Sequence, residues 1–294
     1  MTSILMLSFL SAAAVGFSSC SDDDEKDASV EKEDVTDGLP QDLADKIHAI
    51  YGQASIEPQT VTTVHQLAIL TSVCASLEGR GPITVTPAKL NDKEITLVTL
   101  GGTQEVAGQA TTMKESQLAS FGKPNDYLAA VERLFENGIV PAGKPVLLTG
   151  ISLGGMIAQQ VLGVESITSR FQLEGIITFG SPITLPINRK GVKVVRFADV
   201  NDKVPQLGEM PLRSGMVSVA GLDKSEIKAL IQQLDDTERL ARKSKYAGMI
   251  ETHALSYVED ACWNDVDFMG DSKKNHKLEL KETMKFYAAP KSGK

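Results

Sequence analysis

The sequence predicts a single domain of the α/β class, in which a mostly parallel central sheet is covered by helices on both faces. Segments 145–150, 175–179 and 192–198 are continuous apolar runs, as in strands that are buried on both faces. Helical segments separate these runs, which is typical of parallel strands with crossover connections. The chain has 294 residues, 42% of them hydrophobic, and this is enough for one large core.

The first 38 residues differ from the rest of the chain. Residues 4–17 form an apolar stretch that is too short to span a membrane as a helix but has the length of a signal-peptide core. It ends at Phe17-Ser18-Ser19-Cys20, and residues 21–38 then carry nine acids and two lysines. Such a segment is expected to be disordered. We therefore expect a signal peptide at 1–20, an acidic tether at 21–38 and one domain at 39–294.

The junction at Cys20 resembles a bacterial lipoprotein signal, in which the cysteine becomes the acylated first residue. The run Cys-Ser-Asp-Asp-Asp further resembles the export tags of surface lipoproteins in the Bacteroides group. The resemblance implies an exported protein that is attached to the outer membrane through a lipid on Cys20, on the cell surface or the periplasmic face.

The charge and the cysteines exclude several classes of function. The formal net charge is -8, and the acidic tether accounts for -7 of it, so the domain is nearly neutral and no nucleic-acid partner is expected. Cys74 and Cys262 are too few for a disulfide scaffold; they form either one disulfide or two thiols. No CxxC or HxxxH spacing indicates a metal site, and no cofactor is predicted.

The first half of the domain has clear elements. Helical apolar spacing marks two helices, β-rich runs mark a hairpin that turns at Leu90–Lys93, and Pro124 opens a further helix. The expected ranges are helices at 43–51 and 61–77, strands at 83–89 and 94–100, a loop or weakly held helix at 101–122, and a helix from Pro124 to about Phe135.

The second half alternates between strands and helices. The expected elements are strands at 145–150, 175–179 and 192–198, helices at 153–162, 224–243 and 254–261, and a last edge strand at 277–287. The helix at 224–243 is long and highly charged, so its carboxylates are expected on a solvated face.

Gly150-Ile151-Ser152-Leu153-Gly154-Gly155 contains the pattern G-x-S-x-G between a predicted strand and a predicted helix. This strand–turn–helix setting is that of the nucleophile elbow of α/β-hydrolases, where the serine hydroxyl projects from the top of the sheet. Flanking glycines remove side chains that would clash in so tight a turn. Ser152 is therefore the predicted nucleophile, and the amide of Leu153 is a predicted oxyanion donor.

A nucleophilic serine needs a base, and the chain contains four histidines. His48 and His65 precede Ser152, whereas α/β-hydrolases have the order Ser, Asp or Glu, His along the chain. His276 lies in a hydrophilic loop without a structured neighbour, and His253 lies just before a predicted helix. We therefore expect His253 to be the base.

The acid is expected between Ser152 and His253, after a strand. Asp223, Asp235 and Asp236 belong to the predicted charged helix or to its approach. Asp199 and Asp202 both follow the strand 192–198, and their spacing alone does not decide between them.

Residues 95–257 resemble the class 3 (fungal-type) lipases in four motifs that occur in the family's order. These are Gly150–Gly155, Phe179-Gly180-Ser181-Pro182, Asn201-Asp202-Lys203-Val204-Pro205, and His253 with Tyr257. The resemblance implies an α/β-hydrolase fold, with Asp202 as the acid and His253 as the base. It also places an oxyanion donor at Thr103, in Gly101-Gly102-Thr103, where Gly101 stands in place of the family's arginine, and a lid at 104–122.

The expected function is a serine esterase or lipase that hydrolyses acylglycerol-type carboxylic esters through an acyl-serine intermediate. Its partners would be the ester or lipid substrate and the membrane that holds the anchor on Cys20. A further hypothesis is peptidase or acyltransferase chemistry on the same triad. The alternative from a different class is a non-catalytic surface lipoprotein that binds a ligand or polymer on a hydrolase scaffold.

Overall fold

The computed structural model describes residues 41–51, 55–76, 80–104, 106–120, 122–184, 191–207, 238–259, 261–271 and 275–292. The predicted signal peptide, Cys20, the acidic tether and residues 224–237 lie outside the described residues. Among the helices that are described, none is long and apolar enough to cross a membrane.

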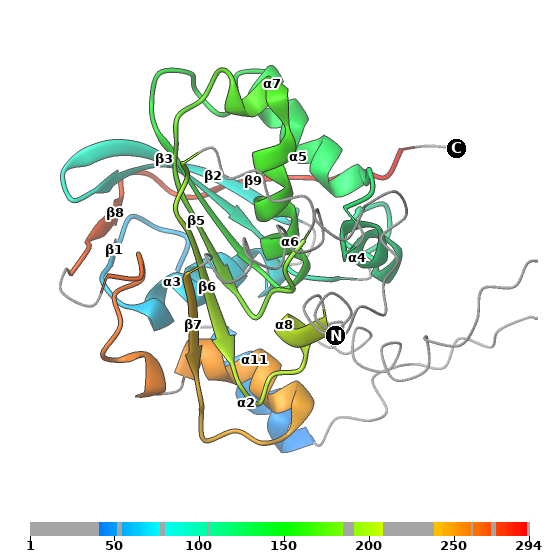
Figure 1. Cartoon of the computed structure of the whole chain (residues 1–294), viewed down its shortest axis with the longest axis vertical. Coiled ribbons are helices and arrows are strands. Elements are labelled where there is room, and N and C mark those ends of the chain that lie inside the picture. The colour runs from blue at the N-terminus through cyan, green and yellow to red at the C-terminus, as the bar shows by residue number, and fades with distance from the viewer. Residues whose placement is uncertain are drawn as a thin grey trace, which may run out of the picture.

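A nine-stranded sheet forms the centre of the fold (Figure 1). Its strands are β1 (Thr60–Val61), β2 (Ile83–Leu90), β3 (Lys93–Leu100), β4 (Val146–Ile151), β5 (Leu173–Phe179), β6 (Val194–Asp199), β7 (Glu238–Arg242), β8 (Leu278–Leu280) and β9 (Lys285–Tyr287). They are ordered β1-β8-β2-β3-β4-β5-β6-β7, and β9 also pairs with β2. Strands β3 to β7 are parallel, and the others pair antiparallel. The α/β class is confirmed.

Helices cover both faces of this sheet. They are α2 (Gln41–Tyr51), α3 (Val64–Ser76), α4 (Met113–Ser120), α5 (Asp126–Glu136), α6 (Leu153–Gln160), α7 (Glu165–Thr168), α8 (Val204–Leu207) and α11 (Met249–Glu259), with short 3-10 turns at Val161–Gly163 and Ala261–Trp263. Helices α4, α5, α6 and α7 lie over one face, and α2, α3 and α11 lie over the other (Figure 1). Apolar side chains of the first group pack with the sheet into one core, and those of the second group pack with it into the other.

Strand β4 shows why the sequence forms two cores. Leu148 packs into the core with α6, whereas its neighbour Leu147 packs into the core with α3 and α11. Because successive side chains of a strand point to opposite faces, a continuous apolar run fills both layers. The arrangement is consistent with an α/β-hydrolase fold.

The predicted hairpin is confirmed, and its turn explains its register. Asn91 and Asp92 have φ angles of 47° and 67°, which is the left-handed pair that a two-residue hairpin turn requires. Strands β2 and β3 then pair without a break from Leu90 opposite Lys93 to Ile83 opposite Leu100.

Three predicted elements need correction. Residues 238–242, predicted as the end of a charged helix, form strand β7, because their backbone pairs with the open edge of β6. The helix predicted at 254–261 begins five residues earlier, at Met249. The last strand at 277–287 is two short strands, and β8 lies between β1 and β2 rather than at the edge.

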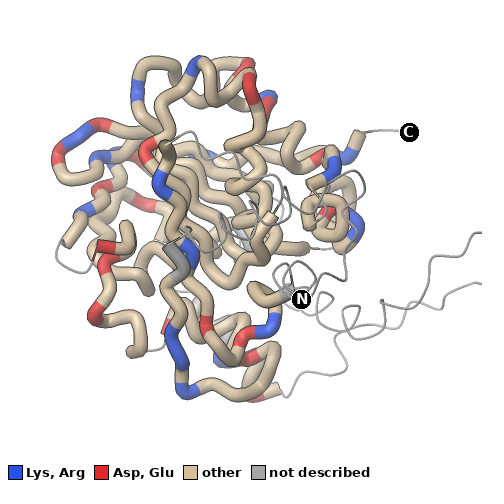
Figure 2. The backbone as a smooth tube through the Cα atoms, in the orientation of Figure 1, with Lys and Arg blue, Asp and Glu red and all other residues tan. Residues whose placement is uncertain are grey.

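Figure 2 shows acidic and basic residues interspersed along the described backbone, without one large region of a single sign. This agrees with the nearly neutral charge that the sequence gives the domain.

Candidate active site

Ser152 occupies a sharp turn between β4 and α6. Its φ and ψ angles are 53° and -121°, a left-handed conformation that costs about 1–3 kcal/mol for a residue with a side chain. A Cβ atom on Gly150 would lie 2.4 Å from the carbonyl carbon of Gly154, and one on Gly154 would lie 2.1 Å from the carbonyl oxygen of Leu100. Both glycines are therefore sterically required, as the pattern predicted.

His253 and Asp202 form a buried hydrogen-bonded pair. His253 Nδ1 lies 2.8 Å from Asp202 Oδ2, and their side chains are 3% and 0% exposed. A carboxylate only accepts hydrogen bonds, so in a neutral imidazole that donates to it from Nδ1, Nε2 is the nitrogen with the lone pair. Nε2 is buried and has no hydrogen-bond partner among the described residues. A nitrogen with this lone pair can accept a proton.

Tyr257 holds the carboxylate of Asp202 from a second side. Its hydroxyl donates to Asp202 Oδ2 at 2.8 Å and accepts the backbone N–H of Asp199 at 3.0 Å. Complete burial raises the pKa of the Tyr257 phenol well above its ordinary value, and the negative charge of Asp202 raises that pKa further. The phenol therefore stays protonated as a donor to the acid.

No hydrogen bond or ion pair joins Asp199 to His253. Its Oδ1 accepts the backbone N–H groups of Asn201 at 2.9 Å and Ser244 at 3.5 Å, so it braces the loop that carries Asp202. Its Oδ2 has no hydrogen-bond partner within the described part of the chain. Of the two acids that spacing left open, Asp202 is the one that meets the histidine.

The elbow and the His–Asp pair meet at one turn after β5. The backbone N–H of Ser152 donates to the carbonyl oxygen of Phe179 at 2.9 Å. The next residue, Gly180, has a φ of 57°, and a Cβ there would lie 3.1 Å from His253 Cε1 and 3.1 Å from Asp202 Oδ2. Residues from three regions of the sequence are thus brought to the same end of the parallel strands. In the described residues, no hydrogen bond joins the Ser152 hydroxyl to His253.

Thr103 lies beside the elbow, just beyond the end of β3. A Cβ on its neighbour Gly102 would lie 3.3 Å from the Cβ of Ser152. The Thr103 side chain is buried, and its Oγ1 is 2.9 Å from Ser116 Oγ on α4. The backbone N–H groups of Thr103 and Leu153 donate no hydrogen bond to another described residue, so both are available donors near Ser152.

Residues 104–122, the predicted lid, contain helix α4. The side chains of Glu115, Ser116 and Ala119 are buried, and Ser120 Oγ lies 3.5 Å from Met156 Sδ on α6. The described part of this segment is therefore packed against the helix that begins at the elbow.

His276, predicted to lack a structured neighbour, has one. Its Nδ1 lies 2.7 Å from Asp267 Oδ1, and its backbone N–H donates to Asp267 Oδ2 at 2.6 Å. Residues nine apart in a loop have no periodic pattern, so the sequence carries no signal for this pair. Among the described residues, no group of three or more His, Cys, Asp or Glu side chains is placed to hold a metal ion.

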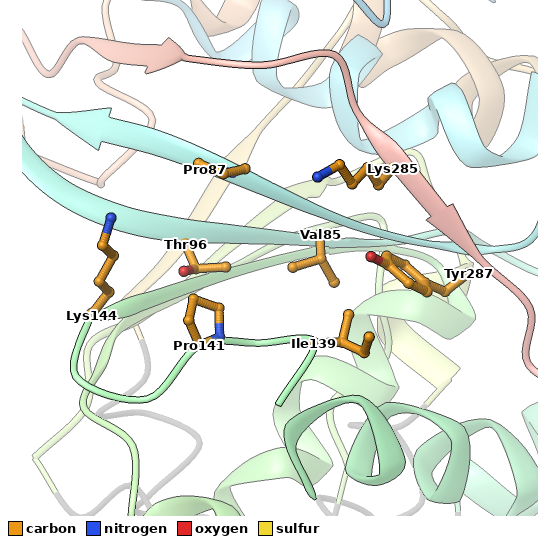
Figure 3. A pocket seen from close by; sticks show the side chains of 8 residues that line it. All are labelled: Val85, Pro87, Thr96, Ile139, Pro141, Lys144, Lys285 and Tyr287. Carbon is orange, nitrogen blue, oxygen red and sulfur yellow. The ribbon is translucent and has the colours of Figure 1, made fainter. Parts of the chain in front are cut away.

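A pocket of about 150 Å³ lies elsewhere, between the β2–β3 hairpin, β9 and the loop after α5 (Figure 3). It is lined by Val85, Pro87, Thr96, Ile139, Pro141, Lys144, Lys285 and Tyr287. Its two lysines already pair with acids, Lys144 with Glu94 at 2.7 Å and Lys285 with Glu282 at 3.4 Å. None of the predicted site residues lines it.

Comparison with known protein families finds no match, and none of the curated proteins matches either. Among solved structures, the chain is similar to a crystal structure of EstE5 that was soaked with p-nitrophenyl butyrate. The two chains are 11% identical, with a TM-score of 0.25, and the match covers 75% of this chain and 99% of that one. A likeness this weak carries no conclusion about activity.

Proposed function

We propose that this protein is a serine hydrolase that cleaves carboxylic esters through an acyl-serine intermediate. The observation that carries the proposal is the buried His253–Asp202 pair, whose Nε2 has no partner among the described residues, at the same turn as the strained Ser152. A buried nitrogen without a hydrogen bond is costly, and such groups are retained where chemistry needs them.

In the proposed reaction, His253 Nε2 accepts the hydroxyl proton of Ser152 while Oγ bonds to the ester carbonyl carbon. The C–O bond to the alcohol then breaks, and the alcohol leaves with the proton from Nε2. A water molecule, deprotonated by the same nitrogen, then attacks the acyl carbon. The bond from this carbon to Ser152 Oγ breaks, Oγ takes the proton back from Nε2, and the carboxylic acid leaves. Asp202 keeps Nδ1 protonated throughout and stabilises the positive charge on the imidazole ring.

The backbone N–H groups of Leu153 and Thr103 are the proposed donors to the oxyanion of the tetrahedral intermediate. Leu153 follows the nucleophile directly at the start of α6, where helix N–H groups have no partner inside the helix. Thr103 lies next to Gly102, where an added Cβ would lie 3.3 Å from Ser152 Cβ. Loss of one such donor typically costs about 10²–10³ in rate.

Acylglycerol-type esters are the proposed substrates, on the strength of the four motifs shared with the class 3 lipases. The hydrogen bonds of His253 and Tyr257 to one carboxylate oxygen of Asp202 give the His-x-x-x-Tyr motif a physical role in this chain. That both residues meet the acid of the Asn-Asp-x-Val-Pro motif supports the resemblance.

Replacement of Ser152 with alanine tests the proposal. We expect the wild-type protein, without residues 1–38, to hydrolyse p-nitrophenyl butyrate and to be labelled by a fluorophosphonate probe. Ser152→Ala is expected to lower turnover by several orders of magnitude and to remove labelling, because the reacting oxygen is gone. If the folded wild-type protein is neither active nor labelled, the chain is instead a binding protein on a hydrolase scaffold.

A further inference from the structure

We propose that Ser181 is a positioning residue whose hydroxyl orients the peptide group that carries the Leu153 oxyanion donor; this rests on the proposed function. Ser181 lies in the turn after β5 and is 2% exposed. Its Oγ donates to the carbonyl oxygen of Ser152 at 2.7 Å. The side chain thus contacts the backbone of the proposed nucleophile itself.

The contact is the shortest that the Ser152 carbonyl makes. The helix N–H groups of Gly155 and Met156 approach the same oxygen at 3.1 and 3.3 Å. The alternative acceptor for the Ser181 hydroxyl, the carbonyl oxygen of Pro182, is 3.3 Å away. The hydroxyl is therefore aimed at Ser152.

The geometry of the peptide bond links this contact to the oxyanion donor. The C=O of Ser152 and the N–H of Leu153 belong to one planar trans peptide, so they point in opposite directions. A hydrogen bond that fixes the oxygen also fixes the direction of the N–H. It also polarises the amide, which strengthens the N–H as a donor. Both effects favour the oxyanion, because pre-aligned donors need no reorganisation during the reaction.

The space at this contact depends on a glycine that lies outside the five-residue elbow pattern. A Cβ on Gly155 would lie 2.6 Å from both Cβ and Oγ of Ser181. Gly155 therefore leaves the room that the Ser181 side chain occupies. This contact explains why Gly154 is followed by a second glycine, Gly155.

The turn that carries Ser181 is itself held firmly. Gly180 N–H donates to the carbonyl oxygen of Phe197 at 3.0 Å, which joins the turn to β6. Gln159 Nε2 on α6 donates to the carbonyl oxygen of Pro182 at 2.9 Å. Because Phe179 accepts the N–H of Ser152, the same turn fixes the peptide groups on both sides of the nucleophile.

The test compares Ser181→Ala with Ser72→Ala. Ser72 is a matched control, because it is also buried and its Oγ donates to a backbone carbonyl, that of Ala68 at 2.8 Å, within α3. For Ser181→Ala we expect kcat to fall about tenfold, less than after complete loss of an oxyanion donor, with KM unchanged. Ser72→Ala is expected to lose about as much thermal stability as Ser181→Ala but to keep the wild-type kcat.

Two further readouts separate positioning from a structural role. The affinity for phenylboronic acid, which forms a tetrahedral adduct on an active serine, should fall by the same factor as kcat in Ser181→Ala. The pH dependence of kcat/KM should keep its wild-type midpoint, because Ser181 has no hydrogen bond to His253 or Asp202. Ser181→Cys, whose thiol is somewhat larger than the hydroxyl and a weaker donor, should lose less activity than Ser181→Ala.

If folded Ser181→Ala has the same kcat and boronate affinity as the wild-type protein, the proposal for Ser181 is wrong. The proposed function would still stand in that case, because the wild-type protein turns over the ester. Failure of the proposed function is different, since the wild-type protein would then lack turnover and labelling. If Ser181→Ala does not fold, Ser181→Cys decides: a reduced kcat with unchanged KM and pH midpoint supports positioning, and a wild-type kcat refutes it.

Discussion

The side chain of Asp202 is a fully buried carboxylate, which the fold must stabilise. Removing a charge from water is costly unless hydrogen bonds replace those to solvent. Asp202 receives three: from His253 Nδ1 and the Tyr257 hydroxyl on Oδ2, and from the Val204 N–H on Oδ1, all between 2.8 and 2.9 Å. Asp199 is equally buried, but one of its oxygens has no hydrogen-bond partner among the described residues.

Replacement with asparagine should therefore lower kcat strongly at Asp202 and leave it almost unchanged at Asp199. In Asp202→Asn, the side-chain amide can donate to Nδ1, which favours the tautomer with a protonated Nε2 that cannot act as a base. We expect kcat for p-nitrophenyl butyrate to fall on the order of 10³–10⁴. Asp199→Asn keeps an oxygen for the Asn201 N–H and removes a buried charge, so it should keep its activity. Equal losses in both variants would contradict this assignment.

The sequence predicted some of these residues better than others. Ser152 could be found because a glycine pattern, a strand and a helix coincide there, and His253 because of chain order. Asp202 could not be separated from Asp199 by spacing, because both follow the same strand and only the path of the loop decides which one reaches the histidine. The role of Ser181 depends on a side-chain contact between residues 29 positions apart, for which a single sequence has no signal.

The position at which helix α11 begins decides whether His253 lies in a loop or inside the helix. The sequence predicted His253 in a loop just before a helix at 254–261. In the structure, His253 lies inside α11, and Tyr257 follows one turn later on the same face. This spacing lets both side chains reach one carboxylate oxygen of Asp202.

Strand β8 offers a prediction on pH dependence. Glu279 pairs with Lys277 and Lys281, which lie two residues away on the same side of the strand. These hydrogen bonds and charges lower the pKa of Glu279 to about 2. A lowered carboxyl pKa adds stability that is present above the ordinary pKa of 4.5 and is lost as the pH falls towards 2.

Glu279→Gln should therefore be less stable than the wild-type protein at pH 7, and this difference should shrink as the pH falls from about 5 to 2. The effect is expected to be small, since the side chain is only partly buried, and smaller again in 1 M salt. Urea unfolding of both proteins at several pH values measures it. A difference that stays constant across this pH range would show that the ion pairs do not contribute.

The first described helix, α2, supports the part of the fold that carries His253. Leu43 and Ile50 of α2 pack against the core that α3 and α11 share. Lys46 Nζ lies 3.0 Å from Glu259 Oε2 at the end of α11 and 3.3 Å from the hydroxyl of Tyr246 in the loop before it. Helix α2 therefore contacts both ends of the segment that holds the proposed base.

Two truncations should consequently behave differently. Removal of residues 1–38 leaves α2 and its contacts intact, so thermal stability and the rate of fluorophosphonate labelling should match those of the longer chain. Removal of residues 1–54 exposes the apolar surface under Leu43 and Ile50, at a cost of about 2 kcal/mol. That corresponds to a fall in Tm of roughly 4–8 °C for a domain of this size, and labelling should slow because α11 is less firmly held. Equal Tm values for the two truncated proteins would show that α2 is not part of the folded unit.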